Sequence, residues 1–185
     1  MCEPTRLEMF LTRLAFFLCG KSVYRTFAER LPLEGGERVL DFGSGMGTVA
    51  FYSARRLPKG HLTCLDISKR WLNACRRTLR SYGNVTCLHS DASALGEDSF
   101  DVVYSHFVLH DIPKNELERV IPKLTGSLRT GGALIFREPL KDTDKISTIK
   151  RLLEKNGLLL KESRVTDIPL MGNALESFYI KYSRL

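Results

Sequence analysis

The stretch that decides the fold is Val39-Leu40-Asp41-Phe42-Gly43-Ser44-Gly45-Met46-Gly47. An apolar strand, predicted over residues 38–42, contains Asp41 near its end and runs into three alternating glycines. A helix is predicted next, over residues 48–57. Glycine lets the backbone turn tightly and lets a ligand approach it closely. The stretch therefore predicts a strand, a ligand-binding loop and a helix in immediate succession.

The details of the loop narrow the class of ligand. Its glycines follow a GxGxG spacing, whereas dinucleotide-binding loops follow GxGxxG. Asp41 beside the loop would repel a pyrophosphate, but it would suit a ligand that carries an ammonium or sulfonium charge. No Gly-Lys-Ser/Thr follows the loop, so a P-loop is excluded.

Strands and helices alternate on both sides of this unit, which predicts an α/β fold with a doubly wound, mostly parallel sheet. Gly172-Asn173 is expected to form a turn before an antiparallel last strand. Pro122 is expected to kink or split the helix around it. Further strands are predicted over 61–67, 85–89, 101–105, 133–136, 158–164 and 176–182, and helices over 7–19, 21–31, 69–82, 114–128 and 145–156. We expect one structural domain, with a helical cap of residues 1–32 on an α/β portion of residues 33–185.

Two more acids follow the next two strands. Asp66 ends the second strand, where a carboxylate can accept both hydroxyls of a ribose. Asp91, before Ala92, follows the third strand, where it can accept a hydrogen bond from an adenine amino group. Either acid alone could instead be a helix N-cap or a loop carboxylate. The ordered set of three acids, each near the end of its own strand, favours a nucleoside ligand.

These motifs resemble those of class I S-adenosylmethionine-dependent methyltransferases, in the group that acts on small molecules. The resemblance covers about residues 21–185. The matching motifs are VLDFGSGMG (39–47), LDIS (65–68), SDA (90–92), FDVVYSHFVLHDI (100–112) and LRTGGALI (128–135). The resemblance implies a seven-stranded Rossmann-like sheet with S-adenosylmethionine as cofactor, and leaves the acceptor open.

The resemblance also implies roles for single residues. The glycine loop, including Ser44, would pass under the cofactor with Asp41 near its methionine end, and Asp66 would hold the ribose. Ile67 and Trp71 would flank the adenine. Asp91 and Ala92 would contact its edge. The cofactor-binding set is thus Asp41, Gly43, Ser44, Gly45, Gly47, Asp66, Ile67, Trp71, Asp91, Ala92, Ser105 and His106, the last two beside the methionine ammonium.

Methyl transfer from a sulfonium requires alignment and exclusion of water, and it needs a base only for a protonated acceptor. The candidate catalytic residues are His106, which follows the fourth strand, Glu138, which follows the fifth, and Tyr24 in the helical cap. Glu138 is expected to face the mouth of the site and to bind a cationic group or pair with Arg137. His110 is expected to be a packed residue. We expect no metal.

Charge suggests a second acceptor class. The formal net charge is +7, and residues 1–92 hold 14 basic against 8 acidic residues, many of them between Arg55 and Arg80. Such a cluster is either a solvated helix face or a surface for nucleic acid. We favour a small-molecule acceptor. The alternatives are a nucleic-acid or protein methyltransferase and a non-catalytic cofactor-binding subunit.

Other features concern the environment of the chain. Five cysteines contain no CxxC pair, and no secretory signal or membrane span is recognisable. We expect reduced thiols that mostly pack in the core, a cytoplasmic protein without a membrane partner, and a monomer or homodimer.

Overall fold

The structure is a computed structural model that describes residues 3–169 and 172–182. The chain divides into two compact units, Met1–Asp91 and Ala92–Leu185. The division into a cap of residues 1–32 and a portion of residues 33–185 stays a prediction.

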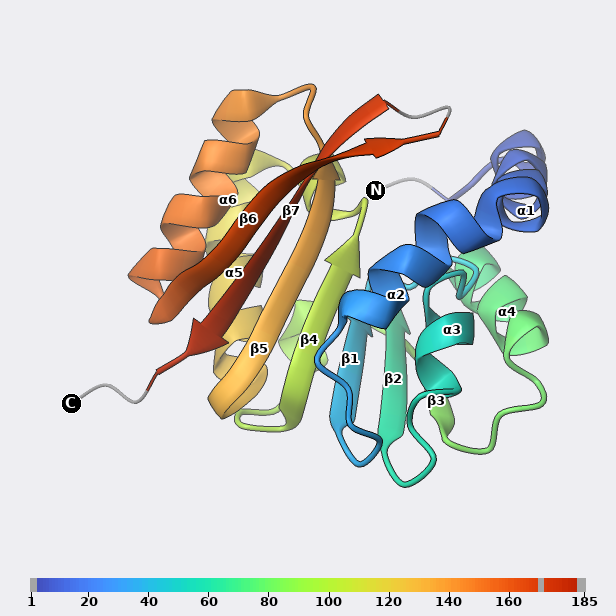
Figure 1. The fold of residues 1–185 in the computed structure, drawn as a ribbon, viewed down its shortest axis with the longest axis horizontal. Coiled ribbons are helices and arrows are strands. Elements are labelled where there is room, and N and C mark those ends of the chain that lie inside the picture. Colours follow the sequence, from blue (N-terminus) through green and yellow to red (C-terminus); the bar gives the residue numbers. More distant parts are fainter. Residues whose placement is uncertain (1–2, 170–171, 183–185) are drawn as a thin grey trace. The chain divides into compact units, whose positions relative to one another are not determined.

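The first unit is built on three parallel strands in the order β3-β2-β1 (Figure 1). The strands are β1 (Arg38–Phe42), β2 (His61–Asp66) and β3 (Val85–His89), and the helices that follow β1 and β2 are α3 (Ala50–Ala54) and α4 (Lys69–Thr78). β1 and β2 are almost wholly buried, as their apolar composition predicts. α3 is shorter than the predicted helix of residues 48–57, because the chain still turns through residues 45–49.

The N-terminal segment is one nearly continuous helical run instead of the two predicted helices. α1 (Arg6–Gly20) passes through a π-helical turn (Lys21–Arg25) into α2 (Thr26–Arg30). A capping box begins α1, with Thr5 and Glu8 each accepting the other's backbone N–H. Gly20 has helical backbone angles and does not break the run, and a Cβ there would lie 3.0 Å from the Tyr52 hydroxyl. Near this glycine, the Phe16 ring of α1 also packs edge-on against the rings of Phe51 and Tyr52 in α3.

The second unit contains four strands in the order β4-β5-β7-β6. They are β4 (Phe100–His106), β5 (Leu128–Pro139), β6 (Leu158–Ile168) and β7 (Gly172–Lys181). β4 and β5 are parallel, and β7 is antiparallel to both of its neighbours, which confirms the predicted antiparallel last strand. The predicted turn at Gly172-Asn173 is wrong, because both residues pair within β7 against the end of β6.

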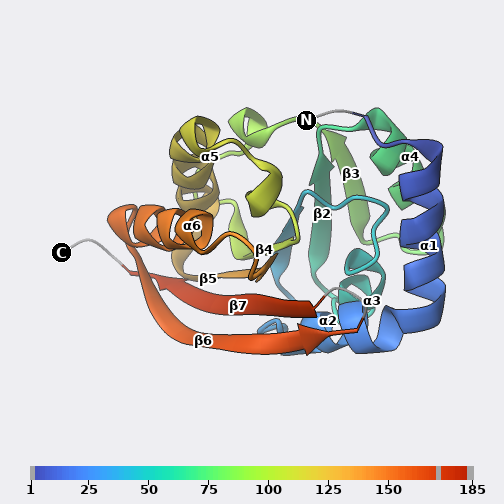
Figure 2. The same ribbon diagram turned by 90° about the horizontal axis from the view of Figure 1, so that it is seen from above.

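Two helices and two short turns complete this unit. They are α5 (Lys114–Ser127), α6 (Thr143–Lys155) and the 3-10 turns Ala92–Ala94 and Leu109–Asp111. Pro122 lies inside α5 without splitting it. The Asp142 carboxylate begins α6 by accepting the Lys145 N–H at 2.9 Å. α5 and α6 lie side by side on one face of the sheet (Figure 2).

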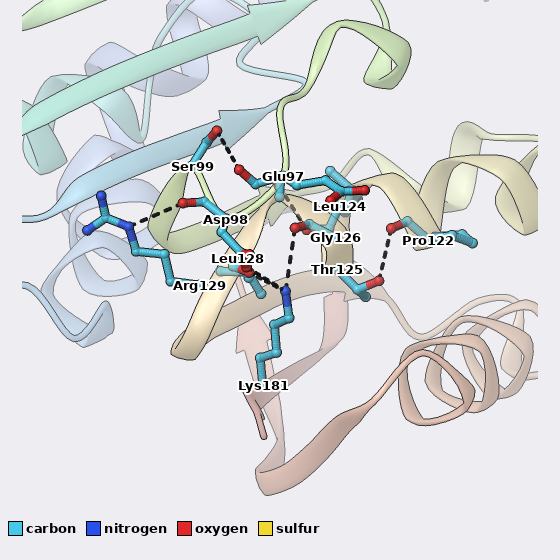
Figure 3. Close-up of polar contacts among 11 residues, drawn as sticks. Glu97, Asp98, Ser99, Pro122, Leu124, Thr125, Gly126, Leu128, Arg129 and Lys181 are labelled. Carbon is cyan, nitrogen blue, oxygen red and sulfur yellow. Dashed lines mark hydrogen bonds and ion pairs between the residues drawn. The ribbon is translucent and has the colours of Figure 1, made fainter. Parts of the chain in front are cut away.

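Lys181, at the end of β7, closes the edge where β4 and β5 begin (Figure 3). Its ammonium contacts the carbonyl oxygens of Gly126 and Leu128 and lies 3.1 Å from the Asp98 carboxylate. A cation is favourable at the C-terminus of α5, where carbonyl groups lack helical partners. The contact anchors the end of the second unit that is opposite to the carboxyl ends of β4 and β5.

Candidate functional site

The glycine loop is held in a conformation that only glycine adopts readily. Gly43, Gly45 and Gly47 have φ angles of +73°, +53° and +79°. The backbone N–H groups of Gly43 and Ser44 both donate to the Leu65 carbonyl oxygen, at 2.8 and 3.0 Å. These bonds tie the loop to the end of β2, so the first two predicted motifs are brought together.

The loop leaves room for a ligand on one side. No described heavy atom lies within 4 Å of the position that a Cβ on Gly45 would take. The Ser44 hydroxyl is buried without a hydrogen-bond partner among the described residues. At Gly47, in contrast, a Cβ would lie 2.9 Å from the Cys75 sulfur. The loop is therefore packed at Gly47 and open at Gly45. The buried Ser44 hydroxyl is suited to a hydrogen bond with a polar group of a ligand.

Asp66 links the loop to α4. Its Oδ2 accepts the Gly45 N–H and its Oδ1 accepts the Ser68 N–H, both at 2.8 Å. Burial raises the pKa of Asp66, and the two backbone hydrogen bonds oppose that shift. Ser68, and not Asp66, is the N-cap of α4. A carboxylate oxygen has about two acceptor positions, so each oxygen of Asp66 keeps one for a further donor.

The other predicted residues of the first unit differ in exposure. Asp41 is buried at the end of β1, whereas Asp91 is exposed. Ile67 is 41% exposed and Trp71 is half-buried on α4, so both can contact a ligand. Tyr24 is buried in the π-helical turn, where burial raises the pKa of its hydroxyl.

Glu3 is a residue that no pattern in the sequence singles out. Its carboxylate accepts hydrogen bonds from the Ser68 hydroxyl at 2.7 Å and from the Lys69 and Arg70 N–H groups at 3.0 and 3.3 Å. The hydrogen bond from Ser68 is the main reason that the pKa of Glu3 is lowered. An acid this far from α4 in sequence carries no local capping signal, so only the fold reveals the contact.

Three thiols of the first unit lie close to one another, and one of them, Cys75, lies against the glycine loop. Cys64 and Cys75 are buried, as predicted for core thiols, and Cys87 is partly exposed with its sulfur 3.7 Å from that of Cys75. Hydrogen bonding from Cys64 is the main cause that lowers the pKa of Cys87 to about 6. Cys2 lies outside the described residues. Cys75 thus contributes to the packed side of the loop at Gly47.

In the second unit, Glu138 holds the loop after β4. Its Oε1 accepts the N–H groups of Val108 and Leu109 at 3.1 and 2.7 Å. Its Oε2 accepts the His110 N–H at 3.2 Å and contacts His110 Nδ1 at 2.6 Å. The side chain of Glu138 is fully buried. Arg137, which the sequence suggests as a partner of Glu138, instead forms an ion pair with Glu176 at 2.7 Å.

The pKa values of His106 and His110 are shifted in opposite directions. Burial, followed by the charge of Arg137, holds the pKa of His106 well below its usual value, so this imidazole is neutral at pH 7. Partial burial also acts to lower the pKa of His110, but the hydrogen bond and charge of Glu138 and the charge of Asp111 raise it overall. Ser105 is buried, and its hydroxyl has no hydrogen-bond partner in the described chain.

The described ranges contain neither a group of metal ligands nor a helix suited to a membrane. Within residues 3–169 and 172–182, no three His, Cys, Asp or Glu side chains are grouped so that they could hold a metal ion. In the same ranges, no helix combines the length and apolar character needed to cross a membrane.

Comparison with known proteins assigns the family. A family model described as a methyltransferase domain matches residues 39–132, which is half of the chain and includes the glycine loop. The chain belongs to this methyltransferase family. The predictions of a methyltransferase enzyme and of S-adenosylmethionine as its cofactor are confirmed at the level of the family.

Relatives of the chain act on different acceptors. It is 32% identical over 108 residues to ribosomal RNA small subunit methyltransferase C of Shewanella halifaxensis. The matched segment covers 56% of this chain and 31% of that protein. It is 23% identical over 112 residues to phosphoethanolamine N-methyltransferase 1 of Zea mays, which covers 58% of this chain and 22% of that protein. The chain thus spans less than a third of the length of these two curated relatives.

A solved structure shows the same fold. Magnesium protoporphyrin IX methyltransferase from Synechocystis PCC 6803, solved with bound S-adenosylmethionine, has a TM-score of 0.73 and 20% identity. The match covers 98% of this chain and 86% of that one. The predicted Rossmann-like fold with seven strands, mostly parallel and with an antiparallel last strand, is confirmed.

Proposed function

We propose that this protein is an S-adenosylmethionine-dependent methyltransferase for a small-molecule acceptor. The observation that carries the proposal is the joint geometry of the glycine loop and Asp66. Gly45 faces open space, and its N–H is fixed on the carboxylate of Asp66, the residue proposed here to hold the ribose. A pre-formed loop of this kind binds a ligand without a large ordering cost.

The cofactor-binding residues keep the roles that the sequence predicts. Asp66 would accept the two ribose hydroxyls on its remaining acceptor positions, while Ile67 and Trp71 flank the adenine and Asp91 and Ala92 contact its edge. Asp41 would lie near the methionine end. Ser44 and Ser105 each carry a buried hydroxyl that a polar group of the cofactor would satisfy.

The bound cofactor supplies a methyl group already activated by a sulfonium. The protein's task is therefore to align the acceptor, to exclude water and, for a protonated acceptor, to take up a proton. His106 is neutral and partly exposed, so it would contact the acceptor and serve as a weak base. Glu138 would act as a positioning residue that fixes the loop of residues 108–110. Tyr24 is proposed to close over the methionine end.

The basic cluster supports a small acceptor over a nucleic acid. Arg56 donates to the carbonyl oxygens of Ala28, Leu31 and Leu33, where it satisfies the end of α2. Arg70 donates to the Pro4 carbonyl, and Arg76 to that of Cys87. These arginines serve the fold of the first unit, so the surface left for phosphate contacts is smaller than the sequence suggests.

Two measurements test this function. Calorimetry with S-adenosylhomocysteine should give a dissociation constant in the micromolar range, and no binding at millimolar ligand would refute the cofactor proposal. A gel-shift assay with structured RNA at low salt tests the acceptor class. We expect no shift, and salt-dependent RNA binding followed by RNA methylation would overturn the small-molecule proposal in favour of the nucleic-acid one.

A further inference from the structure

A cavity of about 710 Å³ lies in the first unit, between α1, the glycine loop, α3 and α4. Its volume is within the range of about 300–1,000 Å³ that is usual for small-molecule sites. Met46 is its only lining residue from the glycine loop, and none of the predicted cofactor or catalytic residues lines it. The cavity is therefore a separate candidate site.

One part of the cavity wall is apolar and aromatic. Phe10 and Phe16 of α1 line it together with Phe51 of α3. The rings of Phe16 and Phe51 are 5.7 Å apart in an edge-on arrangement. Phe10 is 61% exposed, although an aromatic side chain on a helix that covers other helices is expected to pack in the core. The exposed ring gains a function if an apolar molecule fills the cavity.

The other part of the wall is basic. Arg13 of α1, Arg77 in the last turn of α4 and Arg80 just after that helix line the cavity, and no acidic side chain does. No ion pair joins any of these three arginines to another residue in the described part of the chain. Arginine prefers the planar oxygens of a carboxylate or a phosphate. The wall thus offers an anion-binding group beside an apolar surface.

We propose that this cavity binds one amphipathic anion, a molecule with an alkyl or aryl body and a carboxylate or phosphate head. The body would lie against the aromatic wall, and the head would lie between the guanidinium groups. The ligand would join α1 to α4 and so stabilise the N-terminal helix on its unit. The inference does not require methyl transfer, and its test reads binding alone.

The test is calorimetric titration of the full chain with sodium dodecanoate below its micelle concentration. We expect micromolar binding, and binding about tenfold weaker for dodecyltrimethylammonium, which has the same chain but a cationic head. Arg77→Gln should weaken dodecanoate binding about tenfold, because it removes one charged hydrogen-bonding group. Arg55→Gln is the matched control, since Arg55 is an exposed arginine that does not line the cavity.

Several outcomes would overturn the inference. Equal binding of the anionic and cationic detergents, or equal losses in Arg77→Gln and Arg55→Gln, would show unspecific adsorption. α1 also exposes Leu7, Leu14 and Leu18, so sedimentation with phosphatidylglycerol vesicles is the second arm. Binding to vesicles without binding of monomeric dodecanoate would assign the surface to a lipid bilayer instead. Loss of S-adenosylhomocysteine binding would refute the proposed function and leave this inference standing.

Discussion

The glycine loop after β1 and the loop after β4 both follow a parallel strand, yet they are held in opposite ways. The glycine loop has open space at Gly45 and a buried Ser44 hydroxyl without a hydrogen-bond partner among the described residues. In the loop after β4, the carboxylate of Glu138 contacts three backbone N–H groups and one imidazole nitrogen. The first loop thus has space and a polar group available to a ligand, whereas the backbone groups of the second are bound by Glu138.

The difference implies separate roles: the glycine loop binds a ligand, and Glu138 stabilises the loop after β4. Removing a group from a satisfied network leaves buried donors without partners and costs stability. Adding a side chain in the open space of the glycine loop should change stability little but should exclude the ligand. The two loops should therefore respond to substitution in different measurements.

The largest effect on stability is expected at Glu138. Glu138→Ala would leave three N–H groups and one imidazole nitrogen without their acceptor, and breaking such a buried charged network costs about 4 kcal/mol. Urea denaturation measures the loss. Glu138→Gln keeps one acceptor oxygen and should lose less. If the urea midpoint of Glu138→Ala equals that of the wild type, the hydrogen bonds of Glu138 do not stabilise the loop after β4.

The next effect is expected on the packed side of the glycine loop. Gly47→Ala combines a left-handed backbone, at about 1–2 kcal/mol, with overpacking against the Cys75 sulfur, at about 1–3 kcal/mol. Thermal unfolding should show a loss near 3 kcal/mol. Gly47→Ala in a Cys75→Ala background removes the neighbouring sulfur, and an undiminished loss there would contradict the packing account.

Gly45→Ala makes the matched substitution on the open side of the same loop. Only the left-handed backbone opposes it, so the stability loss should be about 1 kcal/mol. Its methyl group enters the space that we assign to the cofactor, so binding of S-adenosylhomocysteine should fall at least about tenfold, or 1.4 kcal/mol. Wild-type affinity in Gly45→Ala would mean that the cofactor does not approach this glycine.

The smallest effect concerns the pH dependence of His110. Its pKa is raised in the folded protein, so its protonated form stabilises the fold. This contribution is fully present below the unfolded pKa of about 6.5 and is lost as the pH rises through the folded pKa. His110→Gln should therefore destabilise the protein more at about pH 5.5 than at about pH 8.5. Urea denaturation of both proteins at each pH measures the difference, and a larger loss at the higher pH would reverse the assignment.

The comparison also shows what the sequence could predict. β1, β3 and the order of strands and helices follow from apolar runs and glycine positions, which are local signals. The contact between Gly45 and Asp66 follows from the rule that parallel strands end at one edge. The four contacts of Glu138 and the capping of α4 by Glu3 could not be predicted, because they join residues distant in sequence.

Two predictions of secondary structure are wrong because contacts between residues distant in sequence decide the conformation there. The sequence predicts separate helices on either side of Gly20 and a turn at Gly172, and glycine commonly interrupts helices and forms turns. Gly20 instead permits the close approach of α1 to Tyr52, and Gly172, the first residue of β7, pairs with Ile168 of β6. Tertiary packing and strand pairing decided both positions.

The central claim is that the end of β2 and the glycine loop hold the cofactor, and calorimetry of Asp66→Ala with S-adenosylhomocysteine tests it most directly. Two hydrogen bonds to a carboxylate contribute about 3 kcal/mol together, so affinity should fall roughly 100-fold. Glu138→Gln serves as the control for a stability effect and should keep affinity within about threefold of wild type, or 0.7 kcal/mol. Unchanged affinity in a folded Asp66→Ala protein would contradict the account.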